Sequence, residues 1–140
     1  MELIAIRPKL VAFRALAVHG DNKGVANGRD EWSFELTQEI NIGLAVPTVE
    51  GGVMQGVVQI ALSAKAVNQK ATDVKAQFAA EYEAKFDFAA ASTEQDASKF
   101  VEQEANQYLL VAQAFPLAMT HFRRELQSMG FDARSLPLGL

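Results

Sequence analysis

The sequence lacks several residues and patterns on which common functional sites depend. None of the 140 residues is cysteine, which excludes a disulfide framework and a thiolate metal site. No run of lysine or arginine occurs, and the formal net charge of -4 gives no long-range attraction for phosphate groups. We therefore expect no nucleic-acid partner.

Signatures of membrane insertion and of catalysis are missing as well. No apolar stretch reaches the roughly eighteen residues of a membrane helix, and residues 1–14 do not have the form of an export signal. We therefore expect no membrane insertion and a cytoplasmic location. The chain has only two histidines, His19 and His121, and no glycine-rich phosphate loop, Gly-x-Ser-x-Gly or His-Glu-x-x-His motif. We expect no enzyme, no cofactor and no metal site.

Alternation with a period of two predicts most of the chain as strands. From residue 32 to 46 the even positions are apolar except Gln38, and the odd positions are polar as far as Asn41. This is the pattern of a strand with one buried face. Similar alternation predicts strands over 58–66 and 76–88, although the alanines and glutamates of the second segment also suit a helix. Residues 3–18 predict a further strand, but apolar residues occupy both of its faces, so its inward face cannot be assigned.

The C-terminal part is predicted to form one long helix. Apolar residues recur there at spacings of four and three, as on one face of a helix. They are Val101, Ala105, Tyr108, Ala112, Phe115, Met119, Phe122, Leu126 and Met129. Ser92 and Thr93 can cap the start of this helix and Gly130 can end it. Pro116 lies inside the stripe and predicts a kink, because proline removes one backbone hydrogen bond.

These elements predict an α+β fold in a single domain over residues 1–140: a four-stranded antiparallel sheet, arranged as a meander, with the long kinked helix packed on one face. Four strands span roughly 15 to 19 Å, whereas a helix with its side chains is about 10 to 12 Å wide. Leaving half of the apolar face in water would cost an amount comparable with the stability of a domain, about 5 to 15 kcal/mol. We therefore expect self-association, an apolar groove or a ligand cavity. The alternative is that the termini fold over the sheet and close the core.

Several short motifs resemble the SecB family of protein-export chaperones. Glu31-Trp32 opens the long alternating strand, as at the start of the family's second strand. Phe115-Pro116-Leu117-Ala118 is similar to the family's Phe-Pro-x-Ala inside its long helix. Gly130-Phe131 follows that helix, and Leu136-Pro137-Leu138 closes the matching region, which covers roughly residues 3–138.

The resemblance implies a four-stranded antiparallel sheet with helices on one face, assembled as a dimer of dimers, with extended client polypeptides held in hydrophobic grooves. The implied partners are non-native polypeptides and further copies of the chain, as a dimer or tetramer. Phe34 stands where the family usually has proline, and the family's final helix and acidic tail, which contact the export ATPase, have no counterpart up to Leu140. These departures speak against handing clients to that ATPase and more weakly against binding them. The expected further partner is the ATPase or, as for solitary SecB-like chaperones, an antitoxin.

The predicted function is that of an ATP-independent holdase for non-native polypeptides or preproteins. Large apolar side chains suit this role because burial is non-directional. The predicted client-binding residues are Trp32, Phe34, Met54, Tyr82, Phe86 and Phe88. The residues predicted for the core or a subunit contact of the helix are Tyr108, Phe115, Met119, Phe122, Leu126 and Met129. Two other classes of protein remain open: a helix-grip domain that binds a small hydrophobic ligand, and a structural or adaptor subunit with one dedicated partner.

Overall fold

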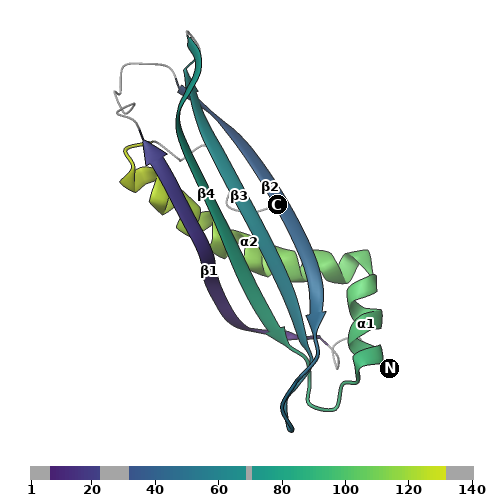
Figure 1. The fold of residues 1–140 in the computed structure, drawn as a ribbon. Helices are drawn as coiled ribbons and strands as arrows, with labels where there is room; N and C mark the ends of the chain where they lie inside the picture. The colour runs from purple at the N-terminus through teal and green to yellow at the C-terminus, as the bar shows by residue number, and fades with distance from the viewer. Residues whose placement is uncertain (1–6, 23–31, 69–70, 132–140) are drawn as a thin grey trace.

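The computed structural model describes residues 7–22, 32–68 and 71–131 of the chain. The described part contains the strands β1 (Lys9–Asn22), β2 (Trp32–Ala45), β3 (Gln55–Asn68) and β4 (Ala71–Asp87), followed by the helices α1 (Glu94–Glu102) and α2 (Glu104–Ser128). The predicted α+β fold is confirmed, and the segment predicted as a strand over 76–88 is a strand as far as Asp87. All pairs of neighbouring strands are antiparallel, and both helices lie on the same side of the sheet (Figure 1).

The order of the strands in the sheet is β1-β4-β3-β2. The predicted meander therefore holds for β2, β3 and β4, whereas β1 pairs with β4 instead of β2. Alternation along a strand specifies its buried face but not its neighbour, so the sequence did not indicate this placement. As a result, β1 and β2 form the two opposite edges of the sheet (Figure 1).

Two bulges explain why apolar residues occupy both faces of β1. The pairing register with β4 shifts after Leu10 and again after Ala15, which leaves Val11 and Leu16 as extra residues. Each extra residue reverses the alternation of the residues that follow it. Leu10 and Phe13 therefore lie on the same face although an odd number of positions separates them, since both pair with helix-facing residues of β4.

The helices cover the central strands more completely than the edges. Helix α2 crosses the sheet obliquely, and α1 lies beside one end of β2 (Figure 1). The helix-facing side chains of β3 and β4 are buried, namely Val58, Ile60, Leu62, Ala64, Ala66, Ala76, Phe78, Ala80, Tyr82, Ala84 and Phe86. Phe88, just after the end of β4, is buried as well. Those of the edge strands are only partly buried, namely Leu10, Phe13, Leu36, Ile40, Ile42 and Leu44. The expected mismatch of widths is thus restricted to the two edges.

The predicted single helix is divided in two at Gln103. Thr93 caps α1 as predicted: its hydroxyl accepts a hydrogen bond from the Asp96 backbone N–H, and the Asp96 carboxylate accepts one from the Thr93 N–H, both at 3.1 Å. The hydrogen bond that the Thr93 backbone N–H donates to the carboxylate is the main cause that lowers the pKa of the Asp96 carboxyl group. Gln103 is extended, with ψ of 126°, and interrupts the helical hydrogen bonds. Nothing in the spacing of the apolar residues indicated this break.

Polar side chains from α2 satisfy the carbonyl groups at the end of α1. The amide of Asn106, which is buried, donates to the Phe100 carbonyl oxygen at 3.0 Å, and the amide of Gln107 donates to the Val101 carbonyl oxygen at 2.7 Å. The last carbonyl groups of a helix have no partner within that helix. The two side chains therefore stabilise the junction between α1 and α2.

Helix α2 continues across Pro116 and ends at the predicted residue. Gly130 has φ of 93°, a conformation that glycine adopts without steric cost. Its N–H donates to the Gln127 carbonyl oxygen at 3.0 Å, and the Phe131 N–H donates to that of Leu126 at 3.1 Å. These two hydrogen bonds form a Schellman motif, which ends the helix at Gly130 as expected.

Candidate functional site

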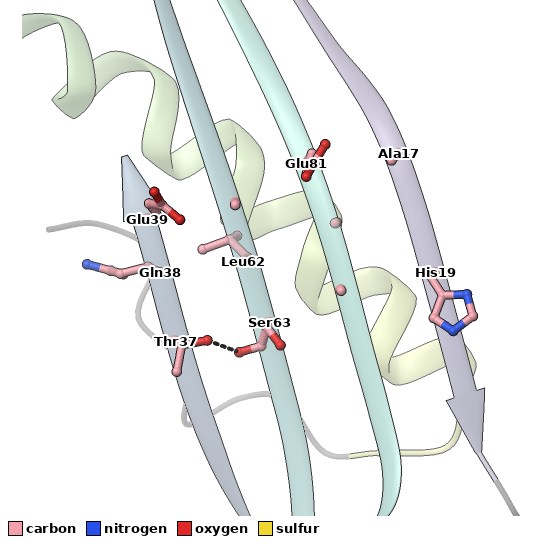
Figure 2. Close-up of a pocket in the computed structure, with 11 residues that line it drawn as sticks. Ala17, His19, Thr37, Gln38, Glu39, Leu62, Ser63 and Glu81 are labelled. Atoms are coloured by element: carbon pink, nitrogen blue, oxygen red, sulfur yellow. Dashed lines mark hydrogen bonds between the residues drawn. The ribbon is translucent and has the colours of Figure 1, made fainter. Parts of the chain in front are cut away.

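A depression lies on the outer face of the sheet, opposite the helices. Two rows of directly paired residues cross all four strands there, namely Ala17, Glu81, Ala61 and Glu39 in one row and His19, Ala79, Ser63 and Thr37 in the other. They line a hollow of about 430 Å³ (Figure 2). The residues of the two central strands are mostly small, whereas longer side chains stand at the edges, so the middle of the face is hollow.

The depression is acidic. Glu39 and Glu81 lie on either side of Ala61 in the same row. Among the described residues neither carboxylate takes part in an ion pair, whereas Glu83, on the same face, lies 3.0 Å from the Arg14 guanidinium. Carboxylates without a paired cation favour a positively charged group at this surface.

The sequence pattern indicated a solvated outer face and gave no sign of this depression. Its shape depends on the register that brings Ala17, Ala61 and Ala79, from three different strands, into two neighbouring rows of the same face. Small residues at these positions are visible in the sequence, but their juxtaposition is not. Only the pairing of the strands reveals it.

The edge of β2 is regular and unpaired. Residues Trp32 to Ala45 pair with β3 without a register shift, and the described residues place no strand on the other side of β2. An edge strand presents a row of backbone N–H and C=O groups without partners in the sheet. The half-buried Leu36, Ile40 and Leu44 lie beside this edge on the helix-covered face.

The edge of β1 has a different character. It carries the two bulges, and its exposed side chains include Val11, Leu16 and Val18, which are 43 to 50% accessible. On α2, Leu117 and Tyr108 are 40 and 58% exposed. Tyr108 therefore does not belong to the core of this chain. Of the two roles predicted for it, core residue or subunit contact, only the subunit contact stays a prediction.

A hydrogen-bonded group links β4 to α2. The Tyr82 hydroxyl lies 2.7 Å from Nδ1 of His121, and Nε2 of His121 lies 3.5 Å from the carboxylate of Glu125. Burial, and secondarily the negative charge of Glu125, raise the pKa of the Tyr82 hydroxyl. Tyr82 therefore remains protonated at neutral pH. The ring of Phe13 stacks on that of Tyr82 with centroids 5.6 Å apart.

Replacing Tyr82 with phenylalanine is expected to lower the free energy of unfolding by about 1 kcal/mol at neutral pH, because one hydrogen bond is lost. The wild-type chain should also lose stability as the pH rises above about 10, since tyrosine ionises there in the unfolded state before it does so in the folded state. Urea unfolding of both chains at neutral and alkaline pH measures the two effects. An alkaline loss of equal size in wild type and Y82F would contradict the assignment to Tyr82.

The structure places four of the predicted client-binding residues in the core. Met54, Tyr82, Phe86 and Phe88 are 5% exposed or less, so a client cannot reach them in this conformation. The side chains of Trp32 and Phe34 lie outside the described residues. The helix residues Phe115, Met119, Phe122 and Leu126 are buried against the sheet, and Met129 is partly buried.

The apolar residues beside the β2 edge were not predicted from the sequence as binding residues. They include Leu36, Ile40 and Ile42 at the β2 edge. The sequence placed these side chains correctly on a buried face, but an edge position is what makes them partly accessible. The order of the strands is needed to recognise it.

The described residues hold no cluster of three or more metal-ligating side chains. None of the described helices is long and apolar enough to cross a membrane.

An open four-stranded antiparallel sheet with helices on one face is the SecB-like α+β fold. A SecB-like chaperone of Mycobacterium tuberculosis, solved in complex with a ChAD peptide from the HigA1 antitoxin, shares it with a TM-score of 0.64. The similarity covers 94% of this chain and 90% of that chain, at 15% sequence identity. At this identity the likeness shows the fold alone. No protein-family model matches the sequence, and no curated protein matches it.

Proposed function

We propose that the chain is an ATP-independent chaperone, a holdase that binds non-native polypeptides and keeps them from aggregating. The observation that carries this proposal is the open sheet. It has an accessible outer face, two edges on which the described residues place no further strand, and large apolar side chains exposed beside one of these edges. The shared fold with a SecB-like chaperone that was solved with a bound peptide supports it. Neither a nucleotide nor a cofactor is part of the proposed cycle.

Such a surface suits clients without a common sequence. Apolar burial is non-directional, and main-chain hydrogen bonds at a strand edge do not depend on side-chain identity. The residues predicted from the sequence, Met54, Tyr82, Phe86 and Phe88, would take part only after the helices move away from them, because all are buried. The first contacts are therefore assigned to the edges.

Self-association is part of the proposal. Val11, Val18, Leu117 and Tyr108 are large, exposed apolar residues on β1 and α2, and covering them favours a dimer or tetramer. Clients of the export pathway or an antitoxin are the proposed substrates. The export ATPase is the proposed further partner of the acidic outer face, and the cytoplasm is the proposed location.

A dedicated adaptor is the second candidate. It is favoured by the antitoxin peptide bound to the M. tuberculosis protein of the same fold. An adaptor would bind one partner in a fixed ratio, whereas a holdase would protect many. The hypothesis of a helix-grip domain that binds a small hydrophobic ligand receives less support. The space between α2 and the sheet is filled by buried side chains, namely Ala114, Ala118, Met119 and Phe122.

Light scattering combined with an aggregation assay tests the proposal. The purified chain is expected to have the mass of a dimer or tetramer and to suppress aggregation of an unrelated denatured protein without ATP. A folded control protein of similar size and charge should have no effect. A monomer that suppresses nothing would refute the holdase. Protection of a single antitoxin-like partner, and of nothing else, would favour the adaptor.

A further inference from the structure

The break between α1 and α2 depends on one backbone angle. Gln103 has φ of -85°, which lies within the range of helices, but ψ of 126°, which is typical of a strand. The residues on either side of it, Glu102 and Glu104, already belong to the two helices. A change of this single ψ to about -40° would therefore join α1 and α2 into one continuous helix.

The local sequence favours the joined helix. Residues 102–105 read Glu-Gln-Glu-Ala, all of them strong helix formers, without glycine or proline. Among the described residues no side chain caps the start of α2, and the first N–H groups of a helix have no partner within it. In a joined helix the N–H groups of Glu104 and Ala105 would donate to the carbonyl oxygens of Phe100 and Val101. The break is therefore not imposed by these residues themselves.

Tertiary contacts hold the bent form instead. The buried ring of Phe100 meets that of Phe88 edge to face, with centroids 5.6 Å apart. The side-chain amides of Asn106 and Gln107 donate to the carbonyl oxygens of Phe100 and Val101 at 3.0 and 2.7 Å. These are the same two acceptors that the joined helix would use for its own backbone. Two sets of hydrogen bonds therefore compete for one pair of carbonyl groups.

Joining the helices would uncover an apolar patch. Helix α1 is bent away from the direction of α2 and lies beside one end of β2 (Figure 1). If α1 instead continued the axis of α2, Phe100 would leave Phe88. Met54 adjoins Phe88, since its carbonyl oxygen accepts a hydrogen bond from the Phe88 N–H at 2.9 Å. Met54, Phe88 and Phe100 are all buried in the bent form, and exposed apolar patches of this kind mark binding sites.

We infer that α1 is a hinged flap: rotation at Gln103 joins it to α2 and opens a client site at Met54, Phe88 and Phe100. This inference rests on the proposed holdase function and specifies how its buried binding residues become accessible. The bent form stores the patch in the core, and the joined form presents it. The hydrogen bonds exchanged at the hinge keep both forms satisfied, so the chain can pass between them without unfolding α1.

The distance between two spin labels distinguishes the bent from the joined form. The chain contains no cysteine, so Gln95→Cys on α1 and Gln113→Cys on α2 provide unique attachment points, and both residues are exposed. In a joined helix their Cα atoms would lie about 27 Å apart, at 1.5 Å per residue. The otherwise unchanged chain should give mainly a shorter distance. Phe100→Ala removes the anchor of α1 and should shift the population toward the long distance about a hundredfold or more. A broad range of distances with loss of helical circular dichroism would mean that α1 unfolds, and would overturn the inference.

A second variant tests the competition for the carbonyl groups while Phe100 stays in place. Asn106→Ala combined with Gln107→Ala removes the two side-chain hydrogen bonds of the bent form. The population at the long distance should rise about tenfold or more. Hydrogen exchange at the N–H groups of Glu104 and Ala105 should slow, because these groups gain partners in the joined helix. Faster or unchanged exchange, with the distance still short, would contradict the hinge.

Gln103→Pro is the matched control that blocks joining. Proline fixes φ at about -65°, near the observed -85°, but disrupts a helix when it lies in the interior. The bent form loses only the hydrogen bond from the Gln103 N–H to the Phe100 carbonyl oxygen, at 3.3 Å. Added to F100A, Q103P should abolish the distance of about 27 Å. A long distance that survives Q103P would show that α1 moves by another route.

The aggregation assay separates the flap from the holdase function. The N106A/Q107A variant, which retains Met54, Phe88 and Phe100, should suppress aggregation of the denatured protein at a concentration several-fold lower than wild type, and Q103P should require more protein than wild type. If N106A/Q107A joins the helices but suppresses aggregation no better, the flap does not control client access and the holdase function stands. If wild type suppresses nothing while the labels report the joined form, the holdase is refuted and the hinge stands.

Discussion

Replacing Phe122 with glutamate is expected to unfold the domain. Phe122 is fully buried, and its ring packs against that of Phe78 with centroids 5.0 Å apart. A carboxylate at this position would lie in the apolar interface between α2 and β4, against the ring of Phe78. Burying an unpaired charge costs several kcal/mol, which is comparable with the whole stability of a domain, about 5 to 15 kcal/mol. Circular dichroism during thermal unfolding measures the loss.

Leu117→Glu is the matched control on the same helix. Leu117 is 40% exposed, so its carboxylate remains hydrated and the free energy of unfolding should change by less than about 1 kcal/mol. If the exposed apolar residues of α2 form a subunit contact, L117E should reduce the mass seen by light scattering while the chain stays folded. A variant F122E that melts like wild type would show that α2 does not pack on the sheet as described.

Replacing Phe100 with alanine is expected to lower the free energy of unfolding by about 3 to 5 kcal/mol. Phe100 and Ala97 are the buried residues of α1. The Phe100 ring meets that of Phe88 edge to face at 5.6 Å, and the Phe88 N–H donates to the Met54 carbonyl oxygen at 2.9 Å. Without this ring, α1 should detach easily and expose Phe88. Urea unfolding gives the stability, and hydrogen exchange of residues 94–102 reports on the attachment of α1.

Tyr108→Ala is the control for the loss of an aromatic ring. Tyr108 is 58% exposed, and its replacement should change the stability of the chain by no more than about 0.5 kcal/mol. A client that binds more tightly to F100A than to wild type would support the prediction that Met54 and Phe88 contact clients once α1 has moved. Equal stability losses in both variants would contradict the role of Phe100 as the anchor of α1.

The predictions of strands and helix ends were correct where they depend on residues close together in the sequence. The alternation from residue 76 to 88 identified β4 correctly against the helical propensity of its alanines and glutamates, because burial of one face outweighs intrinsic preference. Thr93 and Gly130 were recognised as helix ends, since capping depends on residues within one turn. The break at Gln103 was not predicted. Side-chain hydrogen bonds from Asn106 and Gln107 stabilise it, and these leave no trace in the hydrophobic pattern of the sequence.

The predicted binding residues illustrate a different limit. Tyr82, Phe86 and Phe88 were chosen because they are large and apolar, but the same property buries Tyr82 and Phe86 on the central strand β4 and Phe88 just after its end. An apolar residue is accessible only where the sheet ends, and the sequence does not say which strand is last. The partly exposed Leu36 and Ile40 owe their accessibility to the edge position of β2.

The sequence by itself determined the four strands, the limits of the helical segment and the one face of the sheet that is buried, because hydrophobic period and capping residues act over a few neighbouring positions. The tertiary structure alone decided that β1 joins β4, that β2 forms a regular edge with no further strand among the described residues, and that Ala17, Ala61 and Ala79 line one acidic hollow. These features depend on pairing between residues far apart in the chain. Such pairing follows from the fit of whole elements to one another, which no short segment encodes.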